Sequence, residues 1–112
     1  RPWQGKVWMN PPYAADLVGQ FTAKLVAHAN AGDVPEAIAL VNNATETKWF
    51  QHLARAAGAI CFPERRIQFW GPDVERGAPL QGQAFLYLGP EVDRFGATFA
   101  AFGLIVEISP YA

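Results

Sequence analysis

The stretch that decides the fold is KVWMNPPY at residues 6–13. Its first four residues are mostly apolar and suit a β-strand, so we expect a short strand over residues 6–9. Two prolines follow, and because neither has a backbone N–H to donate, they stop a strand ladder at once. The stretch therefore predicts a strand that ends abruptly in a stiff polar loop made of Asn10, Pro11, Pro12 and Tyr13.

Downstream of this loop, apolar residues recur first with a helical period and then as an unbroken run. Leu17, Phe21 and Leu25 are spaced four apart, which predicts a helix, and Gly32 stands where a left-handed C-terminal cap would fall. The run at residues 37–41 is apolar throughout, as in a strand that is buried on both faces.

A second helix with its apolar face over residues 50–57 and a strand over residues 59–62 come next. The order strand, helix, strand, helix, strand indicates an open α/β sheet covered by helices.

The second half of the chain predicts more strands and one further helix. Residues 66–70 and 83–88 resemble strands, and the Gly/Pro-rich stretch between them predicts a hairpin or a long loop. Pro90 is expected to open a third helix and Gly103 to end it, before a last strand over residues 104–106. No linker or repeat divides the chain, so we expect residues 1–112 to form a single domain or part of a larger one.

Composition excludes several classes of protein. The chain has 112 residues, 51% of them hydrophobic, and a formal net charge of −1, which argues against disorder and against a strongly basic nucleic-acid coat. The single cysteine, Cys61, excludes an internal disulfide and a cysteine-rich zinc site, and we expect no metal. No apolar stretch approaches the roughly 18 residues that span a bilayer, and no signal peptide is evident, so a cytoplasmic protein without membrane contact is expected.

The Asn-Pro-Pro-Tyr loop suits one particular chemistry. The Asn10 amide oxygen and a loop carbonyl can accept both hydrogens of an exocyclic amino group, which leaves the nitrogen lone pair free to attack an electrophilic methyl group. Tyr13 can stack on a planar base or amide. The alternative is an ordinary polar turn, because Asn-Pro and Pro-Pro are common in turns. The place of the loop, at the carboxyl end of a strand in an α/β sheet, favours a ligand site.

Four segments together resemble the phage-type DNA N-6-adenine methyltransferases. They are the Asn-Pro-Pro-Tyr loop, the segment TETKWF at residues 45–50, RIQF at residues 66–69 and GQA at residues 82–84. The resemblance runs over residues 8–88, and the TETKWF and RIQF segments favour this family over other enzymes that methylate amino groups.

The resemblance implies a Rossmann-like α/β fold and a site-specific adenine DNA methyltransferase that moves a methyl group from S-adenosylmethionine to N6 of adenine. Asn10 and the Pro11 carbonyl would hold the target amine, with Pro12 stiffening the loop, and Tyr13 would stack on an adenine flipped out of the DNA. It further implies a bacterial host cell and a phage or prophage origin. No metal is required.

The chain departs from the family pattern upstream of the loop. Family members carry an acidic, small-residue cofactor segment there, whereas only nine residues precede Asn10, and the chain begins with Arg1. A phosphate-loop spacing at residues 77–82 fails because Gln83 stands in place of the lysine. We therefore expect the C-terminal half of the sheet with an antiparallel hairpin at its end, in a truncated form whose cofactor-binding residues stay unassigned. The strand at residues 6–9 would become an apolar edge, which predicts self-association through Val7, Trp8 and Met9.

Four further residues are candidates for substrate contact, namely Thr45, Thr47, Lys48 and Arg66. Helix capping is the simpler explanation for the threonines, and Lys48 with Arg66 could contact DNA phosphate. Two other functions stay open. The same loop would serve a methyltransferase that acts on a protein glutamine amide, and a non-catalytic remnant would keep the fold and self-associate or bind nucleic acid.

Overall fold

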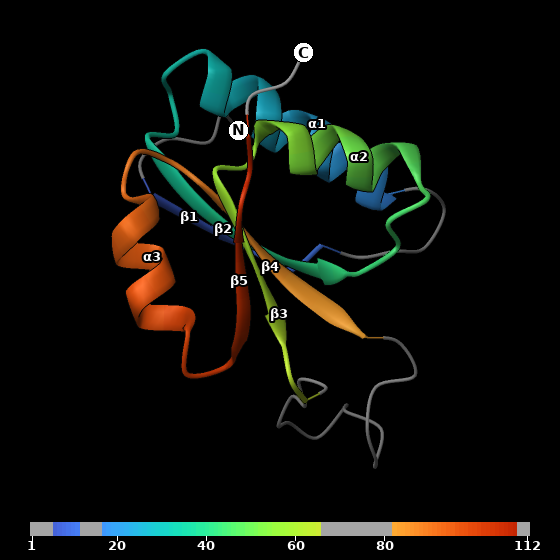
Figure 1. The fold of residues 1–112 in the computed structure, drawn as a ribbon. Helices are drawn as coiled ribbons and strands as arrows, with labels where there is room; N and C mark the ends of the chain where they lie inside the picture. Colours follow the sequence, from blue (N-terminus) through green and yellow to red (C-terminus); the bar gives the residue numbers. More distant parts are fainter. Residues whose placement is uncertain (1–5, 12–16, 66–81, 110–112) are drawn as a thin grey trace, which may run out of the picture.

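The computed structural model describes residues 6–11, 17–65 and 82–109. Within them the chain forms one five-stranded sheet and three helices (Figure 1). In chain order the elements are β1 (Lys6–Met9), α1 (Leu17–Asn30), β2 (Glu36–Asn42), α2 (Lys48–Ala56), β3 (Ala59–Pro63), β4 (Gln83–Leu88), α3 (Val92–Phe99) and β5 (Gly103–Glu107).

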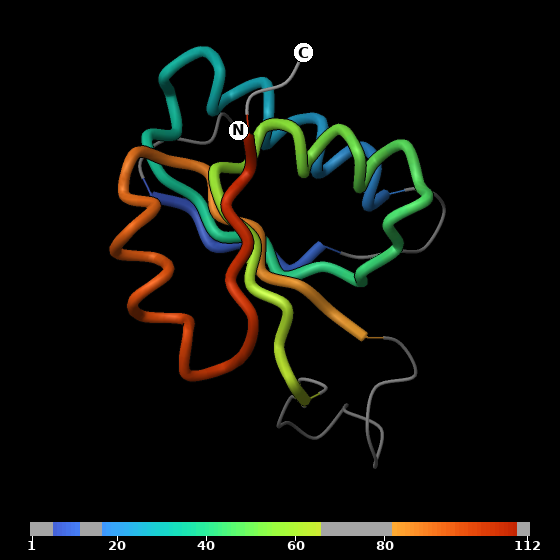
Figure 2. The backbone as a smooth tube through the Cα atoms, viewed as in Figure 1, coloured from blue at the N-terminus to red at the C-terminus, as the bar shows by residue number. Residues whose placement is uncertain are grey.

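The strands lie in the order β1-β2-β4-β3-β5. β1 is parallel to β2, while β4 is antiparallel to both of its neighbours, β2 and β3, and β5 is antiparallel to β3. It follows that β1, β2 and β3 share one direction and that their carboxyl ends meet at one edge of the sheet. Figure 2 shows the path of β4 between β2 and β3. The expected α/β sheet is confirmed.

We expected an antiparallel hairpin at the end of the sheet. Instead, the antiparallel strand β4 lies inside the sheet, between β2 and β3. β4 pairs with β3 through Ala59↔Tyr87 and Cys61↔Phe85, but it pairs with β2 over a longer register, from Ala37↔Leu88 to Asn42↔Gln83. β4 is apolar almost throughout, so it fills the central position, where both faces of a strand are buried.

Helices cover both faces of the sheet (Figure 1). Residues 37, 39 and 41 of β2 and 84, 86 and 88 of β4 point to the face under α1 and α2, where Leu25, Phe50 and Leu53 complete the larger core cluster. The alternate residues point to the face under α3 and form a second cluster with Phe95. Alternation with period two thus supplies a core on each face.

Local signals predicted the end of α1 but neither end of α3. Gly32 has φ +84°, the left-handed conformation expected after α1. The expected start of the third helix at Pro90 is wrong by two residues: α3 begins at Val92 with Glu91 as N-cap. α3 also ends at Phe99, before Gly103, so Phe102 lies outside the helix and is 52% exposed. The strand predicted at residues 66–70 lies outside the described residues.

Candidate active site

The carboxyl edge of the sheet gathers four segments that are far apart in the sequence. Residues 10–11 follow β1, residues 43–48 follow β2, residues 64–65 follow β3, and residues 82–83 begin the antiparallel β4. Ligands of open α/β sheets bind at this edge, because the loops there diverge and leave a crevice. The fold therefore brings most of the residues singled out from the sequence to the edge at which a site is expected.

Asn10 leaves the sheet directly after β1. Met9 pairs with Ala39, so β2 runs on for three more residues, to Asn42, beyond its pairing with β1. The Asn10 side chain is exposed, whereas Pro11 is buried. An amide that projects into solvent from a buried proline anchor is available to a ligand. Pro12 and Tyr13, which complete the predicted loop, lie outside the described residues.

The turn after β2 is held by its own hydrogen bonds. The Thr47 hydroxyl donates to the Ala44 carbonyl oxygen at 2.7 Å and accepts from the Phe50 amide at 3.2 Å. Thr47 is thus the N-cap of α2, the capping role that the sequence offered as the simpler explanation. The Thr45 carbonyl oxygen accepts from the Gln51 side chain at 2.7 Å, and the Thr45 side chain is exposed.

Lys48 is the first residue of α2, and its side chain is exposed. A cation at a helix N-terminus adds to the positive end of the helix dipole and costs free energy instead of contributing it. No acidic residue stands in the first turn of α2 to offset it. The exposed Lys48 and the positive end of the helix dipole therefore lie together at the carboxyl edge, with the exposed Glu46 just before the N-cap. Arg66 lies outside the described residues.

A small hollow of about 230 Å³ lies beside this turn, between the ends of β2 and β3 and the start of β4. The Gln83 side-chain oxygen is buried there without a hydrogen-bond partner among the described residues. A Cβ on Gly82 would come within 2.8 Å of the Asn43 side-chain nitrogen, so a larger residue there would require the Asn43 side chain to move. Arg65 is exposed at the rim.

Asn43 and Gln83 were not singled out individually from the sequence. Gln83 belongs to the GQA segment that carries the resemblance, which is the one signal that could have found it.

The described residues at this edge do not by themselves make a pocket for a nucleoside cofactor. The hollow of about 230 Å³ is smaller than the roughly 300–1,000 Å³ typical of ligand pockets, and Phe62 is the one aromatic residue in its described lining. No cluster of histidine, cysteine and acidic side chains suited to a metal occurs in the described part of the chain. No helix within that part is long and apolar enough to cross a membrane.

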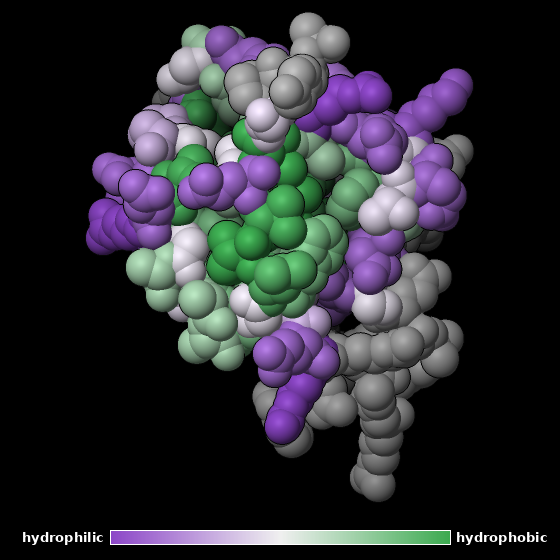
Figure 3. All heavy atoms as spheres, viewed as in Figure 1, coloured by the Kyte–Doolittle hydropathy of each residue, from purple (hydrophilic) through white to green (hydrophobic). Residues whose placement is uncertain are grey.

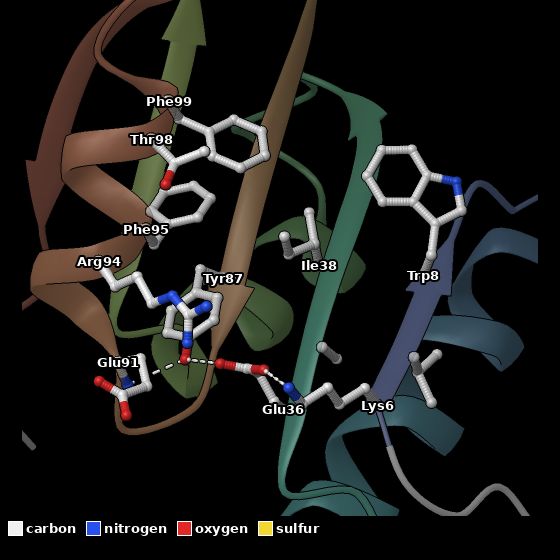
Figure 4. A pocket seen from close by; sticks show the side chains of 12 residues that line it. Lys6, Trp8, Glu36, Ile38, Tyr87, Glu91, Arg94, Phe95, Thr98 and Phe99 are labelled. Carbon is white, nitrogen blue, oxygen red and sulfur yellow. Dashed lines mark hydrogen bonds and ion pairs between the residues drawn. The ribbon is translucent and has the colours of Figure 1, made fainter.

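A larger groove of about 460 Å³ lies elsewhere, on the α3 face, between α3 and β1 (Figure 4). Its polar end is a chain of contacts. Lys6 pairs with Glu36 at 3.5 Å, the Tyr87 hydroxyl donates to Glu36 at 2.6 Å, and the same hydroxyl accepts from the Glu91 amide at 2.9 Å. Lys6 and Glu36 begin β1 and β2. This polar end therefore lies at the end of the sheet opposite to Asn10.

The contacts in the groove shift two pKa values. The hydrogen bond from Tyr87 and the nearby Lys6 ammonium lower the pKa of Glu36. Burial and the hydrogen bond to Glu36 raise the pKa of Tyr87 to about 12. Both shifts favour the neutral phenol of Tyr87 and the ionised carboxylate of Glu36. The hydrogen bond between them therefore stabilises the fold, and neither group changes its protonation state near neutral pH.

Three other side chains that could carry chemistry have ordinary structural surroundings. Cys61 is fully buried, its thiol donates to the Phe99 carbonyl oxygen at 3.6 Å, and burial raises its pKa. Trp49 packs partly buried against the larger core cluster, as an aromatic on a helix face usually does. His28 lies 3.1 Å from Asp33 at the end of α1, away from the carboxyl edge.

Comparison with known families decides the kinship of the chain. The family model of the DNA N-6-adenine-methyltransferases (Dam) matches residues 1–85. The chain belongs to this family. No curated protein and no solved structure matches it.

The match to the DNA N-6-adenine-methyltransferase family spans β1 to the first residues of β4 and includes every segment of the carboxyl edge. The family suspected from the Asn-Pro-Pro-Tyr loop is thus confirmed. α3 and β5 lie outside the matched residues. The groove on the α3 face is consequently built in part by residues that the family model does not cover.

Proposed function

We propose that the chain transfers a methyl group from S-adenosylmethionine to N6 of an adenine in DNA, with Asn10 as the residue that holds the target amine. The observation that carries this proposal is the placement of Asn10: exposed, directly after a parallel strand, at the edge of the sheet where the other family segments gather. Family membership supports the reaction class. A Rossmann-like class of fold is part of the proposal, supported by three strands in one direction joined by α1 and α2.

The residues of this chain would act by holding and orienting the amine. The Asn10 amide oxygen and the Pro11 carbonyl oxygen accept its two hydrogens, which leaves the nitrogen lone pair free for the methyl group. Burial of the Pro11 ring fixes this carbonyl with little conformational freedom. Tyr13 is proposed to stack on the flipped base, and S-adenosylmethionine to supply the methyl group; the described residues assign neither a cofactor pocket nor a step through it.

DNA phosphate is the proposed partner of the positive charge at the start of α2. Lys48 lowers the stability of α2 at this position, which is a cost that contact with an anion would offset. Arg65 at the rim of the hollow, and Arg66 after it, are the proposed further phosphate contacts. Thr45 is proposed to contact the substrate, and Thr47 to hold the turn in place for it.

Methyl transfer tests the proposal directly. The chain is incubated with radiolabelled S-adenosylmethionine and adenine-containing duplex DNA, and binding of the cofactor is measured by calorimetric titration. We expect Asn10→Ala to lower turnover by about 100-fold or more, because it removes a polar group aimed at the reacting nitrogen. The denaturation midpoint should not change, since the Asn10 side chain is exposed.

Asn30→Ala is the matched control, because Asn30 is also an exposed asparagine but ends α1. It should leave turnover unchanged. Full turnover by the Asn10→Ala variant would remove Asn10 from the mechanism. A folded wild-type chain that binds DNA but transfers no methyl group would favour the non-catalytic remnant, and methylation of a glutamine-containing peptide in place of DNA would favour the protein methyltransferase.

A further inference from the structure

α2 turns one side to the core and the other side to solvent. Phe50 and Leu53 are buried in the larger core cluster. Lys48, His52 and Arg55 are exposed. They are spaced four and three apart, so they follow one another along one stripe of the helix, on the side away from the buried residues. We call these three residues the basic stripe of α2.

The stripe has no acidic partner within its own helix. α1 and α2 contain no aspartate or glutamate anywhere along their length. Glu46 is the acid nearest to the stripe in the sequence, and it precedes the N-cap of α2. α3, on the other face of the sheet, carries both signs, with Glu91 as N-cap and Asp93 and Arg94 in its first turn. Exposed helices commonly carry both signs, because opposite charges three or four positions apart attract each other.

The cations of the stripe also have no ion pair with another element among the described residues. The two ion pairs in that part of the chain join Lys6 to Glu36 and His28 to Asp33. Figure 3 shows hydrophilic side chains gathered where α1 and α2 lie in Figure 1, whereas apolar ones gather over β5. Exposed charges of one sign attract an anion from outside the protein. The stripe is therefore suited electrostatically to a polyanion.

The position of the stripe connects it to the carboxyl edge of the sheet. Lys48 begins α2 at this edge, and Arg55 lies in the last turn. At about 1.5 Å per residue, the distance between them is about 10 Å along the helix axis. Consecutive phosphates of one DNA strand are about 3.4 Å apart along the duplex axis, so the stripe is long enough for about three of them. It can thus follow a nucleic-acid backbone that extends past the edge.

We propose that the basic stripe of α2 binds the phosphate backbone of the DNA beside the target adenine, so that the duplex extends from the carboxyl edge along α2. The proposal rests on the proposed function for its partner, and it adds His52 and Arg55 to the contacts given there. An anionic membrane is a less suitable partner. A helix that lies on a membrane inserts its apolar side chains, whereas Phe50 and Leu53 are buried in the core.

Fluorescence anisotropy with a labelled DNA duplex, in the absence of cofactor, tests the proposal. Arg55→Gln should weaken binding about 8-fold at 0.1 M salt and lower the slope of log affinity against log salt by about 0.9, because one phosphate contact is lost. Arg55→Lys keeps the charge and should bind like the wild type. Arg94→Gln is the matched control, because Arg94 is also an exposed arginine on a helix but lies on the other face of the sheet.

Thermal unfolding of each variant verifies the fold, since Arg55 in the last turn also suits the dipole of α2. A wild-type chain that does not bind the duplex would overturn the proposal. Wild-type affinity and salt slope in Arg55→Gln would also overturn it, as would an equal loss in Arg94→Gln. Tighter binding to vesicles that contain phosphatidylserine, weakened by Arg55→Gln, would assign the stripe to a membrane instead.

These outcomes are separate from those of the proposed function. DNA binding that depends on Arg55, in a chain that transfers no methyl group, would support the stripe and contradict the proposed reaction. Methyl transfer that depends on Asn10, with an unchanged affinity for DNA in Arg55→Gln, would support the reaction and contradict the stripe.

Discussion

The two faces of the sheet are covered to different extents. α1 and α2 lie over the first face, where Leu25, Leu53 and Leu86 are 0% exposed. α3 lies over part of the second face, and beyond it β1 and β2 line an open groove in which Trp8 is 58% exposed. The same strands supply apolar residues to both faces, but among the described residues two helices cover the first face and one helix covers the second. The first face is buried under α1 and α2, and the second face is partly exposed to solvent.

The largest predicted effect on stability comes from emptying a site in the core of the first face. Leu53→Ala should lower the free energy of unfolding by about 2–5 kcal/mol, because it empties a fully enclosed site. Ile38→Ala, at the floor of the groove, should lose less than about 2 kcal/mol, since Ile38 is only partly buried. Urea denaturation of dilute protein measures both. Equal losses would contradict the comparison and show that the second face is as enclosed as the first.

A smaller loss of stability should follow when the hydrogen bonds at the polar end of the groove are removed. Tyr87→Phe removes two hydrogen bonds, to Glu36 and from the Glu91 amide, and should cost about 1–2 kcal/mol at neutral pH. It should also change the pH dependence of stability. The Tyr87 pKa is raised to about 12, so its contribution is complete below pH 10, its ordinary pKa, and is lost as the pH rises to 12.

The acid side of the same profile has the opposite sign. The Glu36 pKa is lowered from 4.5, so its contribution is present above that pH and is lost as the pH falls through the lowered value. Tyr87→Phe removes the largest cause of this lowering and should flatten both ends of the profile. Urea midpoints measured from acid to alkaline pH check the prediction. An unchanged alkaline limb in the variant would show that Tyr87 is not the group responsible.

The smallest predicted effect concerns the turn at the carboxyl edge. Thr47→Ala should cost about 1 kcal/mol of stability, because the Phe50 amide loses its cap. Thr45→Ala is the neighbouring control and should stay within about 0.5 kcal/mol, since the Thr45 side chain is exposed. Thermal unfolding of the two variants measures the difference. A greater loss from Thr45→Ala would mean that the hydroxyl of Thr45, and not that of Thr47, stabilises the turn.

Local patterns sufficed for the described strands and for the presence of all three helices. The apolar run at residues 37–41 became the central part of β2, and Gly32 ended α1 as expected. The expected start of α3 at Pro90 was wrong by two residues. Proline suits the residues just before a helix as well as its first turn, so its presence does not fix the first helical residue. Phe102 continued the helical spacing of Phe95 and Phe99 although the helix had ended, so spacing alone overestimated its length.

The sequence by itself determined the kinship of this chain, its alternation of strands and helices, and the exposed asparagine that follows β1. These depend on residues adjacent along the chain, whose local chemistry is nearly independent of the rest. Only the tertiary structure decided that β4 enters between β2 and β3, that Asn43 and Gln83 meet at one hollow, and that Trp8 stands uncovered. Strand order and burial arise from pairings between residues distant in sequence, where many arrangements share one apolar pattern and packing selects among them.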